Sequence, residues 1–166
     1  MKTMAILPYL IVFILALLSG CAVTPPFTDD MIKGVNGSLL PEQVVKENIH
    51  DVEVMWGGVI VHATNTSDHT DFAVLFYPLD SSQRPDRDKP PKSRFIVRYP
   101  GYLETMVYAP GREITVLGKI DGIENGKIGD APYRFPILKA NKIHLWPVGD
   151  DSRVHFGVGV GIGVHM

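Results

Sequence analysis

The chain has little cysteine, little net charge and few of the motifs that mark common enzymes. One cysteine among 166 residues excludes a disulfide within the chain, so its stability must come from packing. The 16 basic and 18 acidic side chains leave a formal net charge of −2, which argues against a strong field for nucleic acid. The chain contains no GxSxG elbow of a hydrolase and no HxH or HxxxH pair of a metal site. These absences exclude a disulfide-rich scaffold and favour no enzyme class.

The single cysteine follows an apolar N-terminal stretch in the order typical of a bacterial lipobox. Lys2 gives a positive start, residues 5–18 form an uncharged apolar run, and a Leu-Ser-Gly-Cys sequence ends at Cys21. The run has about 14 residues, whereas about 20 are needed to cross the hydrocarbon core. The pattern predicts a signal peptide over residues 1–20 that is cleaved between Gly20 and Cys21.

Acylation of Cys21 predicts a membrane anchor without a spanning helix. We expect diacylglycerol on its thiol and a further acyl chain on its freed amine, because two or three chains anchor a protein stably. No other cofactor is predicted, and outer-membrane lipid is the partner expected through this anchor. Ala22 follows the cysteine, where an aspartate would favour the inner membrane of enteric-type bacteria. We therefore expect attachment to the outer membrane on its periplasmic face.

Prolines, glycines and apolar residues divide the remainder of the chain into three parts. Removing residues 1–20 leaves 146 of the 166 residues, enough for one domain with its own core. Residues 21–38 contain adjacent prolines and turn-forming residues, which predicts a flexible periplasmic linker. Residues 39–149 carry the pattern of a single β domain. Residues 150–166 form a Gly/Val-rich tail, which could pair with a sheet edge, rest on a membrane or stay flexible.

Five apolar segments predict a mainly β fold. They cover residues 52–61, 72–79, 94–99, 113–120 and 133–146. A short helix is expected before them over Pro41–Glu47, and a helical turn between the third and fourth over 103–108. This order matches a small five-stranded OB-like barrel with one or two short helices, and an antiparallel β-sandwich is the alternative.

Details of these segments give further expectations. Gly57-Gly58 interrupts the first strand and predicts a bulge or bend. The second strand is apolar on both faces, which predicts that both are covered. The charged, proline-rich stretch 80–92 predicts a long exposed loop. Asp121-Gly122 and Asn125-Gly126 predict tight turns.

Several short motifs follow the lipobox in a characteristic order. They are Trp-Gly-Gly-Val-Ile from Trp56, Tyr-Pro-Leu-Asp from Tyr77, Pro85-Asp86, Arg94-Phe95, Pro-Gly-Tyr-Leu from Pro100, Gly111-Arg112 with Thr-Val-Leu-Gly from Thr115, and Tyr133 to Pro136 with Trp146. Over residues 38–147 this set resembles the Slp family of outer-membrane lipoproteins, the starvation-inducible lipoproteins of Gram-negative bacteria. The resemblance implies a cell-envelope lipoprotein linked to stationary phase or stress. It implies no catalytic residue and no cofactor.

Two clusters of polar and aromatic residues are candidate sites. His62 and His69, beside Asp68 and Asp71, could converge across a turn as transition-metal ligands do. Surface histidines and aspartates near a turn are common, however, and none is spaced as a tight pair. We therefore predict no metal site and no catalytic residues.

The second cluster is a binding surface formed by Arg94, Arg98, Tyr99 and Tyr102. OB-type barrels bind ligands through aromatic side chains beside charged loops. The negative net charge and the periplasm exclude nucleic acid, so a glycan, a lipid head group or an envelope protein is the expected ligand. The alternative is that the aromatic residues are core and the arginines keep an edge strand soluble. The sequence thus favours a non-catalytic envelope stress or structural role, with a binding module as the alternative.

Overall fold

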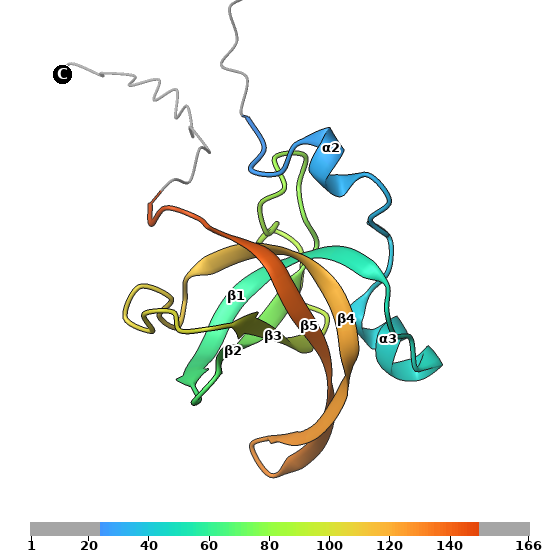
Figure 1. Cartoon of the computed structure of the whole chain (residues 1–166), viewed down its shortest axis with the longest axis vertical. Helices are drawn as coiled ribbons and strands as arrows, with labels where there is room; N and C mark the ends of the chain where they lie inside the picture. Colours follow the sequence, from blue (N-terminus) through green and yellow to red (C-terminus); the bar gives the residue numbers. More distant parts are fainter. Residues whose placement is uncertain (1–23, 150–166) are drawn as a thin grey trace, which may run out of the picture.

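The computed structural model describes residues 24–149, and β-strands dominate this part of the chain (Figure 1). The strands are β1 (Glu53–Asn65), β2 (His69–Tyr77), β3 (Arg94–Pro100), β4 (Glu113–Ile128) and β5 (Ala131–Leu145), and the helices are α2 (Asp29–Ile32) and α3 (Pro41–Glu47). The helix predicted over Pro41–Glu47 is confirmed. Within residues 24–149, no helix has the length and apolar character required to cross a membrane.

The five strands close into a barrel in the order β1-β2-β3-β5-β4. Neighbouring strands are antiparallel except β3 and β5, which run parallel from the Ile96–Ile137 pair to the Arg98–Lys139 pair. A hydrogen-bonded turn lies between β3 and β4, where the N–H groups of Val107 and Tyr108 donate to the Glu104 carbonyl oxygen at 3.0 and 3.1 Å. This order confirms the predicted OB-like barrel rather than the sandwich.

Aromatic side chains fill the barrel. Trp56 lies 5.1 Å from Phe95 between ring centroids at an interplanar angle of 72°, and Phe76 packs edge-on against both rings. The indole N–H of Trp56 donates to the Leu39 carbonyl oxygen at 2.8 Å, so the buried ring leaves no polar atom unpaired. Val44 of α3 is fully buried in the same core cluster, which attaches the helix to the barrel.

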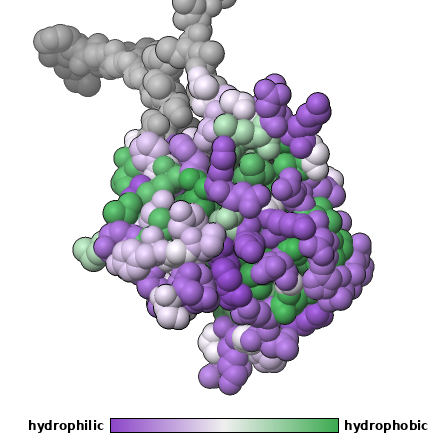
Figure 2. All heavy atoms as spheres, in the orientation of Figure 1, coloured by the Kyte–Doolittle hydropathy of each residue, from purple (hydrophilic) through white to green (hydrophobic). Residues whose placement is uncertain are grey.

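The β2 prediction is confirmed for one face and wrong for the other. Phe72, Val74 and Phe76 are buried, whereas the alternate residues Leu75 and Tyr77 are partly exposed. The reason is barrel closure, which gives each strand one inner and one outer face. In the view of Figure 2, hydrophilic residues cover the β4–β5 hairpin at the bottom, and hydrophobic residues gather at the upper left.

Two glycine predictions are wrong for physical reasons. Of the bulge or bend predicted at Gly57-Gly58, the bulge is absent, because both glycines pair in regular register with β2 and β4 and the register of β1 shifts only between Ile60 and His62. A Cβ on Gly58 would meet the Leu75 carbonyl oxygen, so the glycine allows close approach of the two strands.

The predicted turns at Asp121-Gly122 and Asn125-Gly126 lie inside the β4–β5 ladder. Asn125 pairs with Arg134, and the strand continues to Ile128. The register shift between Ile120 and Gly122 makes this site a bulge rather than a chain reversal. The long twisted hairpin extends from the barrel as a two-stranded ribbon (Figure 1).

The N-terminal segment is packed on the barrel, which corrects the linker prediction for residues 27–36. Phe27 is 3 % exposed, its N–H donates to Gln83 Oε1 at 3.0 Å and its carbonyl oxygen accepts from Gln83 Nε2 at 2.9 Å. Further along, Asn36 forms a parallel bridge with Val54. Two backbone hydrogen bonds to one buried amide fix the segment, so it is not free chain.

The stretch 80–92 is also less exposed than predicted. Gln83 and Pro85 are buried, and Pro85 forms a bridge with Leu79. The predicted signal peptide, Cys21 and the tail 150–166 lie outside the described residues.

Candidate functional site

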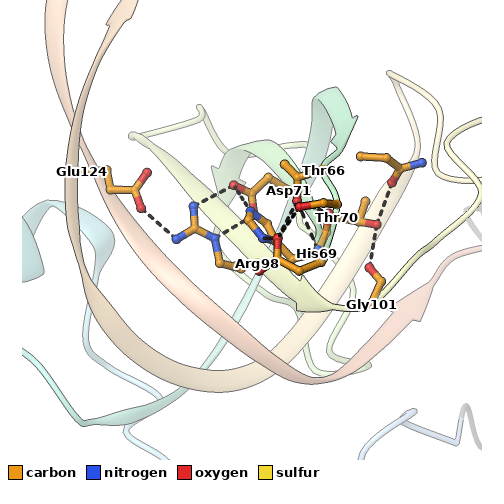
Figure 3. A network of polar contacts seen from close by, with 10 residues as sticks. Thr66, His69, Thr70, Asp71, Arg98, Gly101 and Glu124 are labelled. Atoms are coloured by element: carbon orange, nitrogen blue, oxygen red, sulfur yellow. Dashed lines mark hydrogen bonds and ion pairs between the residues drawn. The ribbon is translucent and has the colours of Figure 1, made fainter.

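A polar network links β2, β3 and β4 on the outside of the barrel (Figure 3). Arg98 donates to Asp71 through Nε at 3.0 Å and through Nη2 at 2.8 Å, and its Nη1 donates to Glu124 Oε1 at 2.8 Å. Hydrogen bonds to Asp71, and then to Glu124, raise the pKa of Arg98 above its usual range. Because two carboxylates pair with one guanidinium, the cluster around Arg98 has no excess positive charge that would attract an external anion.

The histidine cluster joins this network without forming a metal centre. His69 Nδ1 lies 2.9 Å from Asp68 Oδ1, and His69 Nε2 lies 3.5 Å from Asp71 Oδ2. The hydrogen bond with His69, followed by that with Thr66, lowers the pKa of Asp68. Across residues 24–149, no group of three or more histidine, cysteine or carboxylate side chains could hold a metal ion. The imidazole of His69 therefore serves to connect the two aspartates.

The four residues of the predicted binding surface do not converge. Arg94 and Arg98 alternate with the buried residues of β3 and lie on its outer face. Tyr99 packs against the core instead, because adjacent residues of a strand point to opposite faces. Tyr102 is 70 % exposed on the loop after β3, where its hydroxyl donates to Glu104 Oε2 at 3.4 Å.

Another cluster surrounds a cavity of about 330 Å³ and is here called the arginine pocket. The pocket is lined by Arg84, Arg87, Gly111, Arg112, Glu113, Trp146, Pro147, Val148 and Gly149. The first two arginines come from the β2–β3 loop. Gly111 and Arg112 directly precede β4, which begins at Glu113, and the residues from Trp146 to Gly149 follow β5. The barrel therefore brings together three segments that are far apart in the sequence.

Hydrogen bonds fix Trp146 as one wall of the arginine pocket. Its indole N–H donates to Thr115 Oγ1 at 3.0 Å, and that hydroxyl donates to the Gln83 carbonyl oxygen at 2.7 Å. Its backbone N–H donates to the Glu113 carbonyl oxygen at 2.9 Å. The ring of His144 packs edge-on at 4.5 Å, and burial lowers the pKa of this histidine. The wall is thus held before any ligand arrives.

The charges of the arginine pocket are unbalanced. Among the described residues that line it, Glu113 is the one carboxylate, and it pairs with Arg84 at 2.7 Å and with Arg87 at 3.6 Å. Arg112 donates instead to two neutral carbonyl oxygens, those of Val107 at 3.0 Å and Trp146 at 2.9 Å. Carbonyl groups orient a guanidinium without cancelling its charge, so the described lining of the pocket has three guanidinium groups and one carboxylate.

The sequence did not predict this pocket, although some of its residues lie in motifs or segments that the sequence analysis singled out. Gly111-Arg112 and Trp146 belong to the family motifs, and Arg84 and Arg87 lie in the charged loop. No local spacing links them, because only barrel closure brings them together. The pocket offers donors and an aromatic face but no Ser, Thr, Cys or His among its lining residues, so its chemistry is suited to holding an anion.

The sequence of this chain is similar to those of known bacterial proteins. A family model described as Outer membrane lipoprotein Slp family matches residues 18–159. A lipoprotein of Escherichia coli called YeaY is 31% identical over 136 residues, covering 78% of this chain and 67% of that protein. A protein of Haemophilus influenzae is 32% identical over 132 residues, covering 78% and 70%. The Escherichia coli outer membrane protein Slp is 29% identical over 94 residues, covering 57% and 50%.

Proposed function

Since this chain belongs to the Slp family of outer membrane lipoproteins, we propose that it is attached through acylated Cys21, faces the periplasm and acts without catalysis. The observation that carries this proposal is the lipobox ending at Cys21, which precedes one small barrel. Ala22 after the cysteine supports the outer membrane as the destination. The role is that of a structural or stress lipoprotein of the envelope, with acyl chains as its only covalent additions.

The polar clusters of the described barrel support a role without catalysis. Arg98 and His69 are engaged with carboxylates, and Glu113 is engaged with two arginines. A general base needs a carboxylate or imidazole that can reach a substrate proton. These groups are instead used to tie strands and loops together.

A second candidate function is a binding module of the envelope. The arginine pocket favours it, because its preset aromatic wall and excess positive charge are properties of a ligand site. A lipid head group, a glycan or an envelope protein could then be the partner. The two candidates are compatible, since an anchored structural protein can also bind.

The anchor is tested by intact mass and membrane fractionation in a Gram-negative host. We expect the wild type to lack residues 1–20, to carry acyl chains and to be recovered with the outer membrane. Cys21→Ala should lose all three properties, whereas Ser19→Ala keeps a small residue beside the cleavage site and serves as the matched control. An unmodified wild-type chain that retains residues 1–20 would contradict the proposal.

The periplasmic orientation needs a separate measurement. Protease added to intact cells should leave the protein whole, and protease added after permeabilisation of the outer membrane should degrade it. Degradation in intact cells would place the barrel on the cell surface instead.

A further inference from the structure

We propose that the arginine pocket binds a phosphate group, and that the anchor brings it to phosphate-bearing head groups at the membrane. The source of the phosphate rests on the proposed function, because it depends on the acylated cysteine. The site itself rests on the geometry of the barrel alone. Two independent observations lead to it, namely the chemistry of the pocket and its position relative to the N-terminal segment.

The chemistry of the pocket matches a phosphate group. Guanidinium groups bind phosphate oxygens through planar, paired N–H donors. Arg112 is oriented by two carbonyl oxygens and keeps its full charge. Arg87 has a side chain that is 52% exposed and contacts Glu113 at 3.6 Å, a separation beyond the usual range for a charge-assisted hydrogen bond. Both arginines can therefore approach a further anion without breaking a tight ion pair.

Arg84 plays a different part in the pocket. It is held by Glu113 at 2.7 Å, and its guanidinium carbon lies 5.5 Å from the centroid of the Trp146 ring. This stacking places a fixed positive group against the aromatic wall. The cavity of about 330 Å³ is of the size that a small phosphorylated head group needs.

The position of the pocket follows from the clamp between Phe27 and Gln83. The two hydrogen bonds to Gln83 hold the N-terminal segment against the loop that contributes Arg84 and Arg87. Phe27 is the sixth residue after Cys21. Because an extended residue spans at most about 3.6 Å, the clamp lies within about 22 Å of the cysteine. In Figure 1 the described chain enters and leaves at the upper end, away from the β4–β5 hairpin.

The experiment uses the full mature lipoprotein in nonionic detergent micelles. Its fluorescence comes mainly from two tryptophans, of which Trp56 is 1 % exposed in the core and Trp146 lines the pocket. The protein is titrated with inorganic phosphate and, separately, with short-chain phosphatidylglycerol added to the micelles. We expect a saturable change in fluorescence with at least one of these probes.

Charge variants assign that change to the pocket. Arg87→Glu and Arg112→Gln should weaken binding about ten-fold or more, because each removes a donor to the phosphate. Lys127→Glu, near the tip of the β4–β5 hairpin, is the matched reversal of an exposed charge and should bind as the wild type does. Arg94→Glu should also bind normally, although it alters the surface predicted from the sequence.

The outcomes decide three questions separately: whether the pocket binds phosphate, which molecule carries that phosphate, and whether the protein is anchored. Binding of inorganic phosphate supports a soluble ligand, and binding of phosphatidylglycerol alone supports a membrane head group. No saturable change, equal weakening by Lys127→Glu, or loss only in Arg94→Glu would overturn the proposal. If the purified protein has no acyl chains, the proposed anchor fails, but the inorganic phosphate titration still decides whether the pocket is a site.

Discussion

Arg98 and Arg112 are both held by several hydrogen bonds, but their partners differ in charge. Arg98 faces the carboxylates of Asp71 and Glu124, whereas Arg112 faces the carbonyl oxygens of Val107 and Trp146. The first arrangement cancels the guanidinium charge, and the second only directs it. Arg98, which the sequence analysis placed in a binding surface, thus connects strands. Arg112, which it did not, lines a cavity with its charge uncompensated.

The two regions also differ in what they connect. The Arg98 network joins the paired strands β2 and β3 to β4, which pairs with neither of them, on the outer face of the barrel (Figure 3). The arginine pocket joins a loop, the start of β4 and the end of β5 around a cavity. We therefore expect substitutions in the network to act on stability, and substitutions of Arg87 and Arg112 in the pocket to act on binding.

The largest effect on stability should come from the clamp beneath the pocket. Gln83→Ala removes both hydrogen bonds to the buried backbone of Phe27 and leaves its N–H and carbonyl oxygen unpaired. Since each buried unpaired group costs about 1–3 kcal/mol, we expect the free energy of unfolding to fall by about 3 kcal/mol. Urea denaturation followed by tryptophan fluorescence measures this loss.

The matched control for the clamp is Ser82→Ala, because Ser82 lies next to Gln83, is only partly buried and has its hydroxyl bonded to the Asp80 side chain. Limited proteolysis gives a second readout, since residues 24–38 should become cleavable in Gln83→Ala. Equal stability of the two variants would show that the N-terminal segment is not fixed by Gln83.

A smaller loss is expected from the Arg98 network. Asp71→Asn replaces a two-point contact with a charged partner, which should lower the free energy of unfolding by about 2 kcal/mol. Glu124→Gln should cost less, because the Glu124 side chain is 50% exposed and makes one contact. Urea denaturation of both variants checks the order, and a larger loss in Glu124→Gln would contradict it.

Local patterns predicted much of the fold. The helix Pro41–Glu47 and the order of the five strands follow from proline placement and from the spacing of the apolar segments. The β4–β5 ladder did not follow, because Asp-Gly and Asn-Gly pairs also occur in bulges and twisted ribbons. Which of these they form depends on pairing with a strand that comes later in the chain.

The candidate sites were harder to predict than the strands. Arg94 and Arg98 are close in the sequence, yet Arg98 is neutralised by Glu124 from a different strand. Arg112 is brought beside Trp146 only by the closed barrel. The net charge at a site depends on which side chains the fold brings together, and the spacing of residues in the sequence does not predict it.

As the pH falls, the stability contributed beside the arginine pocket should be lost first, and that of the Arg98 network later. Burial lowers the pKa of His144, beside the pocket wall, below its ordinary 6.5. The unfolded chain then takes up a proton below pH 6.5 before the folded chain does, so stability is fully present above that pH and falls toward the folded pKa. Asp68 of the network has its pKa lowered below 3.8, chiefly by His69, so its contribution is lost only at much lower pH.

His144→Gln should therefore flatten the dependence of stability on pH between about pH 7 and 5. Urea midpoints across this range measure the effect, with His62→Gln as the control for loss of an exposed imidazole. A wild-type midpoint that rises on acidification would show that protonated His144 is stabilised by its surroundings, contrary to the burial argument.

The smallest effect on stability should come from Arg87→Glu. Its side chain is 52% exposed and its ion pair with Glu113 is long at 3.6 Å, so the free energy of unfolding should change by less than about 0.5 kcal/mol. Asp71→Asn should give the opposite pattern, with lower stability and unchanged phosphate binding. If Arg87→Glu instead destabilises the barrel as much as Asp71→Asn does, the pocket arginines are structural ties like Arg98, and the difference in partner charge does not separate the two regions.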